Sequence, residues 1–155
     1  MPDPHAPRPA HEVLTRDQMR RYARHIALRE VGGAGQLRLL GAEVHLVGTG
    51  PAAEEAARYL AAAGVGRLVV EPALAARLGD ELAALNPDCQ VGAPPSHPLD
   101  GEGGETTVQA GPFEPDDRLE GCLGALAIMN HIVGVGAAAQ TSSPSGAFRW
   151  ETPRP

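Results

Sequence analysis

The chain has 155 residues, enough for one domain built around a single hydrophobic core. Its net charge of −6 argues against the clustered basic face of a nucleic-acid-binding protein, so we expect no nucleic-acid partner. Alanine supplies 26 of the apolar residues, which predicts a small core with closely packed helices. The 13 Lys and Arg residues are all arginine, which excludes every reaction that needs a lysine.

The chain contains two cysteines, Cys89 and Cys122, and no C-x-x-C pair. This excludes a four-cysteine zinc site within one chain and a disulfide framework, so zinc and other metal sites are not expected. No apolar stretch approaches the roughly 18 residues of a membrane-spanning helix, and the amino terminus lacks a signal-peptide pattern. We therefore expect a cytoplasmic protein with no membrane partner.

The first predicted helix follows a proline-rich segment, residues 1–12, that we expect to be a disordered lead. Thr15 and Gln18 match a capping box, and the helix is predicted to continue to about Leu28. We expect its buried face to consist of Met19, Tyr22, Ala23 and Ile26. Gly32 and Gly33 are expected to end it, and a short helix is predicted over 36–40.

A strand–helix–strand unit follows. Residues 43–47 alternate apolar and polar side chains and end at Gly48-Thr49-Gly50, which is typical of a strand entering a tight turn. A helix is predicted over 52–63, and a second strand over 67–70 ends at Glu71. This pattern predicts an α/β, Rossmann-like fold over residues 13–92, with a small parallel-type sheet, flanking helices and an N-terminal helical extension.

The remaining elements are fewer and more widely spaced. A third helix is predicted over 72–85 and a short strand over 89–91. Residues 93–117, rich in Gly, Pro and acidic residues, are expected to be a flexible linker with at most one strand, at 106–109. Residues 118–139 are expected to include a helix that packs on the core, and residues 140–155 a tail with a short strand at 148–150.

The turn after the first strand carries a nucleotide-binding pattern. Gly48 and Gly50 follow a strand and open a helix, and Glu71 ends the next strand. Glycines at such a turn let the backbone approach a phosphate, while the acidic residue can bind a ribose hydroxyl. Ala53 replaces the third glycine of the pattern. An ordinary strand–turn–helix connection explains the glycines equally well.

Four segments in a fixed order make the pattern more specific, namely 21–26 (RYARHI), 35–37 (GQL), 44–50 (VHLVGTG) and 59–66 (YLAAAGVG). Together they resemble the ThiF/MoeB/HesA family, bacterial relatives of ubiquitin-activating enzymes. The resemblance implies adenylation of the C-terminal carboxylate of a ubiquitin-like sulfur carrier.

The resemblance also assigns residues, partners and a ligand. It implies that Gly48 and Gly50 belong to an ATP-binding loop and that Glu71 holds the ribose. Arg24 matches an arginine that, in family dimers, reaches toward the ATP phosphates of the other subunit. The alternative interpretation of Arg24 is a solvated helix face. ATP is therefore the implied ligand. The implied partners are a second copy, a related full-length protein and a ubiquitin-like carrier protein.

Departures from the family pattern concern the active site. Pro51, Ala53, Glu54 and Glu55 stand where the family continues with glycines and serine. Pro51 lacks an N–H, and the two glutamates place negative charge at the start of the helix. The catalytic lysine of the family has no counterpart, and the span from Pro87 to Gly121 is too short for its magnesium-binding aspartate, crossover loop and zinc cysteines. No catalytic residue is assigned, and a shortened, degenerate member is implied.

Three functions follow from these observations. The first is a protein-binding or scaffold partner that has lost adenylation, in a ubiquitin-like, sulfur-carrier or other biosynthetic pathway. The second is an adenylating enzyme that a partner subunit completes. The third is a sensor that binds an adenine nucleotide without turnover. Thiamine, molybdopterin, cysteine and secondary-metabolite pathways all remain open.

Overall fold

The structure, a computed structural model, describes residues 13–92, 101–105, 117–134 and 149–153. The lead expected over 1–12 and the strand expected over 106–109 lie outside these ranges. Among the described residues, no helix is both long and apolar enough to cross a membrane.

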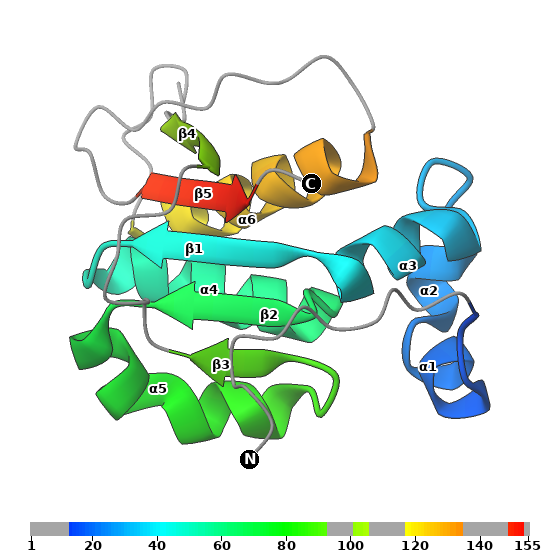
Figure 1. Cartoon of the computed structure of the whole chain (residues 1–155), viewed down its shortest axis with the longest axis horizontal. Coiled ribbons are helices and arrows are strands. Elements are labelled where there is room, and N and C mark those ends of the chain that lie inside the picture. Colours follow the sequence, from blue (N-terminus) through cyan, green and yellow to red (C-terminus); the bar gives the residue numbers. More distant parts are fainter. Residues whose placement is uncertain (1–12, 93–100, 106–116, 135–148, 154–155) are drawn as a thin grey trace.

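A five-stranded sheet forms the centre of the described part of the chain, in the order β3-β2-β1-β5-β4 (Figure 1). Its first three strands are parallel, which confirms the predicted Rossmann-like α/β fold. The other two pair antiparallel, β5 with β1 and β4 with β5. The strands are β1 (Glu43–Val47), β2 (Arg67–Val70), β3 (Gln90–Gly92), β4 (Gly101–Glu105) and β5 (Arg149–Pro153).

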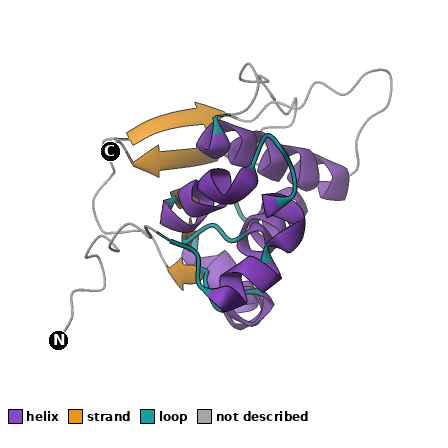
Figure 2. Ribbon diagram, turned by 90° about the vertical axis from the view of Figure 1, so that its right-hand side faces the viewer, coloured by secondary structure: helices purple, strands orange, loops and turns teal. Residues whose placement is uncertain are grey.

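Three helices, α4 (Pro51–Ala63), α5 (Pro72–Leu85) and α6 (Asp117–Val133), lie on one face of the sheet (Figure 2). The alanine-rich α4 is central to the core, and Ala53 and Ala56 are fully buried. Small side chains let α6 pack directly on α4, because a Cβ at Gly121 would stand 2.4 Å from the carbonyl oxygen of Ala52. The alanine content therefore produces the closely packed core that the composition predicts.

The chain enters the fold through three helices, α1 (Arg16–Arg21), α2 (Ala23–Ile26) and α3 (Gly32–Gly41). Thr15 and Gln18 form the predicted capping box. The expectation of one continuous helix to Leu28 is wrong, because the chain leaves helical geometry at Tyr22. Tyr22 is buried in the core, whereas Met19, expected beside it, is 47% exposed.

A hydrogen-bond network holds the Tyr22 side chain at this break. The Tyr22 hydroxyl donates to Asp88 Oδ2 at 2.8 Å and accepts from Asn86 Nδ2 at 2.8 Å. Asn86 Nδ2 also donates to the carbonyl of Ala61 at 3.0 Å, so the network joins the N-terminal helices to α4. Gly64 leaves room for the ring, since a Cβ there would lie 2.6 Å from the Tyr22 hydroxyl. The network holds α1 and α2 against the end of the core.

The later elements differ from the prediction mainly at their ends. The strand predicted at 89–91 is β3, one residue later, and the strand predicted at 148–150 is β5, which continues to Pro153. Residues 101–105, within the stretch expected to be a linker, form β4. The predicted C-terminal helix is α6, which packs on α4 and ends at Val133.

Candidate functional site

The candidate nucleotide site lies where β1 and β2 end. The two strands are parallel and in register, with Leu46 opposite Val70, so their carboxyl ends meet at one edge of the sheet. Gly48 and Gly50 follow β1 at this edge, and Glu71 follows β2 (Figure 1). The carboxyl edge is where ligands bind in open α/β sheets. The fold therefore brings three of the four expected site residues to one edge.

The two glycines of the turn differ in what they require. Gly48 has φ +149°, a conformation that side chains disfavour, so the turn itself needs glycine there. Gly50 has φ −81°, and a Cβ added to it would meet no atom within 4 Å. Packing within the described chain therefore does not require glycine at position 50. The open space above Gly50 is compatible with close approach of a ligand to the backbone.

The start of α4 carries an ion pair. Pro51 occupies the first turn of the helix, and Gly50 is its N-cap. The carboxylate of Glu54, near the start of the helix, pairs with Arg77 of α5. The same Arg77 guanidinium donates to the carbonyl of Thr49 at 3.0 Å, within the glycine turn. An acidic side chain of the protein, with its own counterion, therefore lies beside the end of α4 that would face a phosphate.

The neighbouring Glu55 behaves differently from what the sequence suggested. We expected Glu54 and Glu55 to act together at the start of the helix. The Glu55 carboxylate instead accepts from Arg58 at 3.1 Å and lies 3.4 Å from Arg118 Nε. A Cβ at Gly121 would approach Glu55 Cβ to 2.7 Å, which places the glutamate at the junction of α4 with α6. Only Glu54 is paired across the glycine turn.

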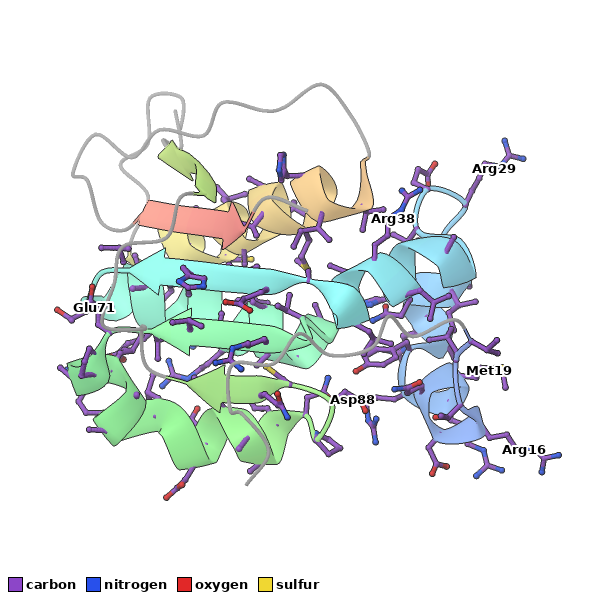
Figure 3. The ribbon with its side chains drawn as sticks, in the orientation of Figure 1. Arg16, Met19, Arg29, Arg38, Glu71 and Asp88 are labelled. Carbon is purple, nitrogen blue, oxygen red and sulfur yellow. The ribbon has the colours of Figure 1, made fainter. Side chains whose placement is uncertain are left out.

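Glu71 combines a structural role with a free carboxylate. Its carbonyl accepts from the amides of Leu74 and Ala75, both at 2.9 Å, and so starts α5. Its side chain points away from the ribbon at the carboxyl edge (Figure 3). Among the described residues it makes no hydrogen bond or ion pair. The carboxylate is free to accept hydrogen bonds from a ligand.

Arg24, the fourth expected residue, is far from the other three. It belongs to α2, which lies beyond the opposite end of β1 (Figure 1). Its side chain is exposed. Within one chain Arg24 therefore takes no part in the cluster at the carboxyl edge.

Arg77 is the residue that the sequence reasoning missed. It is 23 positions from Glu54 and lies on a different helix, so no local pattern connects the two. Its position, less than two turns after Glu71 at the start of α5, is the only signal in the sequence. Helix packing brings it over the glycine turn.

The described residues suit a ribose better than a triphosphate. Glu71 offers a free acceptor, and Gly50 leaves space above the backbone. At the phosphate position, however, Pro51 lacks an N–H and the Glu54 carboxylate would repel a triphosphate. No group of three or more His, Cys, Asp or Glu that could hold a metal ion occurs among the described side chains.

Known proteins resemble part of the chain closely. The adenylyltransferase and sulfurtransferase MOCS3 is 51% identical over 65 residues in Bos taurus, 42% of this chain, and 54% identical over 67 residues in Mus musculus, 43% of this chain. The SAMP-activating enzyme E1 of Haloferax volcanii is 53% identical over 57 residues, 37% of this chain. Over this part, the chain is similar to adenylyltransferases of the ThiF/MoeB type.

The similarity covers a small part of these family members. The chain spans 14% of the length of each MOCS3 protein and 21% of the Haloferax enzyme. No family model matches the chain. The names of the relatives describe adenylyltransferase, sulfurtransferase and SAMP-activating activities of those proteins.

Proposed function

We propose that this chain does not adenylate a substrate by itself and instead acts as a protein-binding partner in a ubiquitin-like, sulfur-carrier or related biosynthetic pathway. The observation that carries the proposal is the Glu54–Arg77 pair beside the glycine turn, with Arg77 also held by the Thr49 carbonyl. The pathway type is inferred from the MOCS3 and SAMP-activating relatives.

The ion pair acts against nucleotide binding in two ways. The start of a helix attracts anions through its free N–H groups and its dipole. Glu54 places a fixed negative charge there, and Arg77, the cation nearest to it, is already engaged. A triphosphate would have to displace Arg77 from Glu54 and approach a carboxylate. The family resemblance also implies a catalytic lysine for adenylation. The chain contains no lysine.

The amino-terminal end of the sheet supports a binding role. Arg21, Tyr22 and Asp88, in segments that match the family, form one connected network there. An ordered surface at this end of the molecule supports a protein-binding role. The expected partners are a second copy, a related full-length protein or a ubiquitin-like carrier protein.

A nucleotide sensor is the second candidate. The free Glu71 carboxylate and the open space above Gly50 support binding of an adenosine moiety without turnover. An enzyme completed by a partner subunit is the third candidate. It is supported by Arg24, because α2 lies beyond the end of β1 opposite to the glycine turn.

The decisive experiment combines ATP–magnesium calorimetry with pyrophosphate exchange in the presence of a ubiquitin-like carrier protein. We expect no exchange by the wild-type chain. Exchange by the isolated chain would overturn the proposal, whereas ATP or adenosine binding without exchange would favour the sensor.

A matched pair of variants tests whether the Glu54 carboxylate opposes ATP binding. Glu54→Gln removes the carboxylate beside the turn and releases Arg77, so we expect ATP affinity to rise about tenfold. Glu55→Gln makes the same charge change one residue away, at the α4–α6 junction, and should leave ATP affinity unchanged. Equal behaviour of the two variants would show that Glu54 does not block the site.

A further inference from the structure

Among the arginines whose side chains the structure describes, those without a partner are confined to one part of the molecule. Of the arginines whose side chains the structure describes, those at positions 21, 38, 58, 67, 77 and 118 each bind a carboxylate or a carbonyl. The remaining four make no such contact among the described residues, and all lie between positions 16 and 29. They are Arg16, Arg20, Arg24 and Arg29, and all four are exposed.

The charge of this segment is opposite to that of the chain. Residues 13–31 contain five arginines and two acidic residues, Asp17 and Glu30, and so carry +3. The other residues contain eight arginines and 17 acidic residues, and carry −9, which together give the net charge of −6. The basic charge is thus concentrated at the end of the molecule formed by α1 and α2 (Figure 1).

Two exposed apolar side chains belong to the same segment of the chain. Met19 is 47% exposed and Leu28 is 51% exposed. Arg16, Met19 and Arg29 point away from the ribbon at the same end of the molecule (Figure 3). We call the set Arg16, Met19, Arg20, Arg24, Leu28 and Arg29 the α1–α2 surface. Arginine and methionine are enriched at protein–protein interfaces, while lysine and acidic residues are depleted.

The backbone beneath this surface is firmly held. Tyr22 is buried against Gly64 and joined to Asn86 and Asp88. His25 Nδ1 lies 2.8 Å from Gln36 Oε1, and Gln36 Nε2 donates to the carbonyl of Ala63 at 3.0 Å. The arginines therefore stand on a backbone that needs little ordering when a partner binds, which lowers the entropic cost of association.

We propose that the α1–α2 surface binds an acidic protein segment that carries apolar side chains. The carboxylates of the segment pair with the four free arginines, and its apolar side chains cover Met19 and Leu28. This inference rests on the proposed function only in that both require a protein partner, and it names the surface and the chemistry of that partner.

A protein fits this surface better than a polyanion does. Asp17 and Glu30 are exposed within the same segment and would face the phosphates of a nucleic acid or a lipid headgroup. The −9 charge of the remaining residues also repels a long polyanion. A short protein segment can avoid these repulsive contacts, and its apolar side chains can pack on Met19 and Leu28.

The test uses fluorescence anisotropy with a labelled synthetic peptide of alternating Glu, Leu and Gly. A second peptide with Gln in place of Glu serves as the ligand control. We expect the acidic peptide to bind and the neutral one to bind at least tenfold more weakly. The double variant Arg16→Gln/Arg20→Gln should weaken binding about fivefold. The double variant Arg58→Gln/Arg118→Gln makes the same charge change at paired arginines elsewhere and should leave binding unchanged.

The Met19→Ser/Leu28→Ser variant separates a protein-type surface from simple charge attraction, and it should also weaken binding of the acidic peptide. Equal binding of both peptides, or equal effects of the two arginine variants, would overturn the proposal. Tighter binding of a single-stranded oligonucleotide or of anionic vesicles than of the peptide would overturn it as well. So would self-association through the same arginines, seen by sedimentation velocity, without peptide binding. None of these outcomes affects the ATP and exchange measurements on which the proposed function depends.

Discussion

The Tyr22 hydroxyl donates a hydrogen bond of 2.8 Å to the Asp88 carboxylate, and this contact joins residues 66 positions apart. Tyr22 follows α1, and Asp88 lies between α5 and β3, so the bond connects the N-terminal helices to the segment that leads into β3. Asp88 also accepts from Gln18 at 3.3 Å and from Arg21. Burial raises the pKa of Tyr22 to about 12. The hydrogen bond that Asn86 donates opposes this rise, and the Asp88 carboxylate adds to it.

Removing the Tyr22 hydroxyl should destabilise the fold. Tyr22→Phe keeps the buried ring but deprives Asn86 and Asp88 of a partner, and we expect a loss of about 1–2 kcal/mol in the free energy of unfolding. Urea denaturation measures the change. Tyr59, the other tyrosine, is 45% exposed, and Tyr59→Phe should cost less than about 0.5 kcal/mol. Equal losses would show that the network contributes no stability.

The Asp88 network should also make stability depend on pH. Partial burial disfavours the ionised carboxylate, but hydrogen bonds from Tyr22, Gln18 and Arg21 outweigh it and hold the pKa of Asp88 below its usual range. Because the folded pKa is lowered, the contribution is complete above the ordinary pKa of an aspartate and is lost as the pH falls through the folded value.

Wild type and Asp88→Asn should therefore differ most at neutral pH. We expect the variant to be less stable there and the difference to shrink as the pH falls below about 4. Chemical denaturation across this pH range, on both proteins, gives the comparison. A difference that stays constant with pH would show that the carboxylate charge does not matter.

Two glycine-to-alanine substitutions should change the free energy of unfolding in opposite directions. Gly64 has φ +91°, and a Cβ there would lie 2.6 Å from the Tyr22 hydroxyl, so Gly64→Ala should cost about 2–4 kcal/mol. Gly79 lies inside α5 with no atom within 4 Å of its added Cβ, and Gly79→Ala should stabilise by about 0.5–1 kcal/mol. Thermal melts of the two variants would report shifts in opposite directions. A stabilising Gly64→Ala would contradict the position of Tyr22.

The contact between α4 and α6 can be tested at Gly121. An added Cβ would stand 2.4 Å from the Ala52 carbonyl oxygen, so Gly121→Ala should force the helices apart and cost about 1–3 kcal/mol. Urea denaturation measures the loss, with Ala127→Gly as a second change on the same helix that creates no clash. Wild-type stability of Gly121→Ala would mean that α6 does not pack on α4 at this point.

Local chemistry explains which parts of the fold the sequence predicted. The capping box joins Thr15 and Gln18, which are three positions apart. Its hydrogen bonds need only the local geometry of a helix start. The strand–helix–strand unit from 43 to 71 is bounded by glycines whose backbone geometry is intrinsic, such as Gly48 and Gly64. These features put Gly48, Gly50 and Glu71 at one edge of the sheet before any contact between distant residues is known.

Only the tertiary structure decided what surrounds that edge. Helix packing brings Arg77 to Glu54, 23 positions away, and turns Glu55 toward α6 instead of the glycine turn. The Tyr22 hydroxyl is bound by Asn86 and Asp88, more than 60 positions away. The place of β5 beside β1 depends on pairing across about a hundred residues. The sequence by itself determined most of the elements, because those depend on short-range geometry. Which charges meet was decided by how the elements pack.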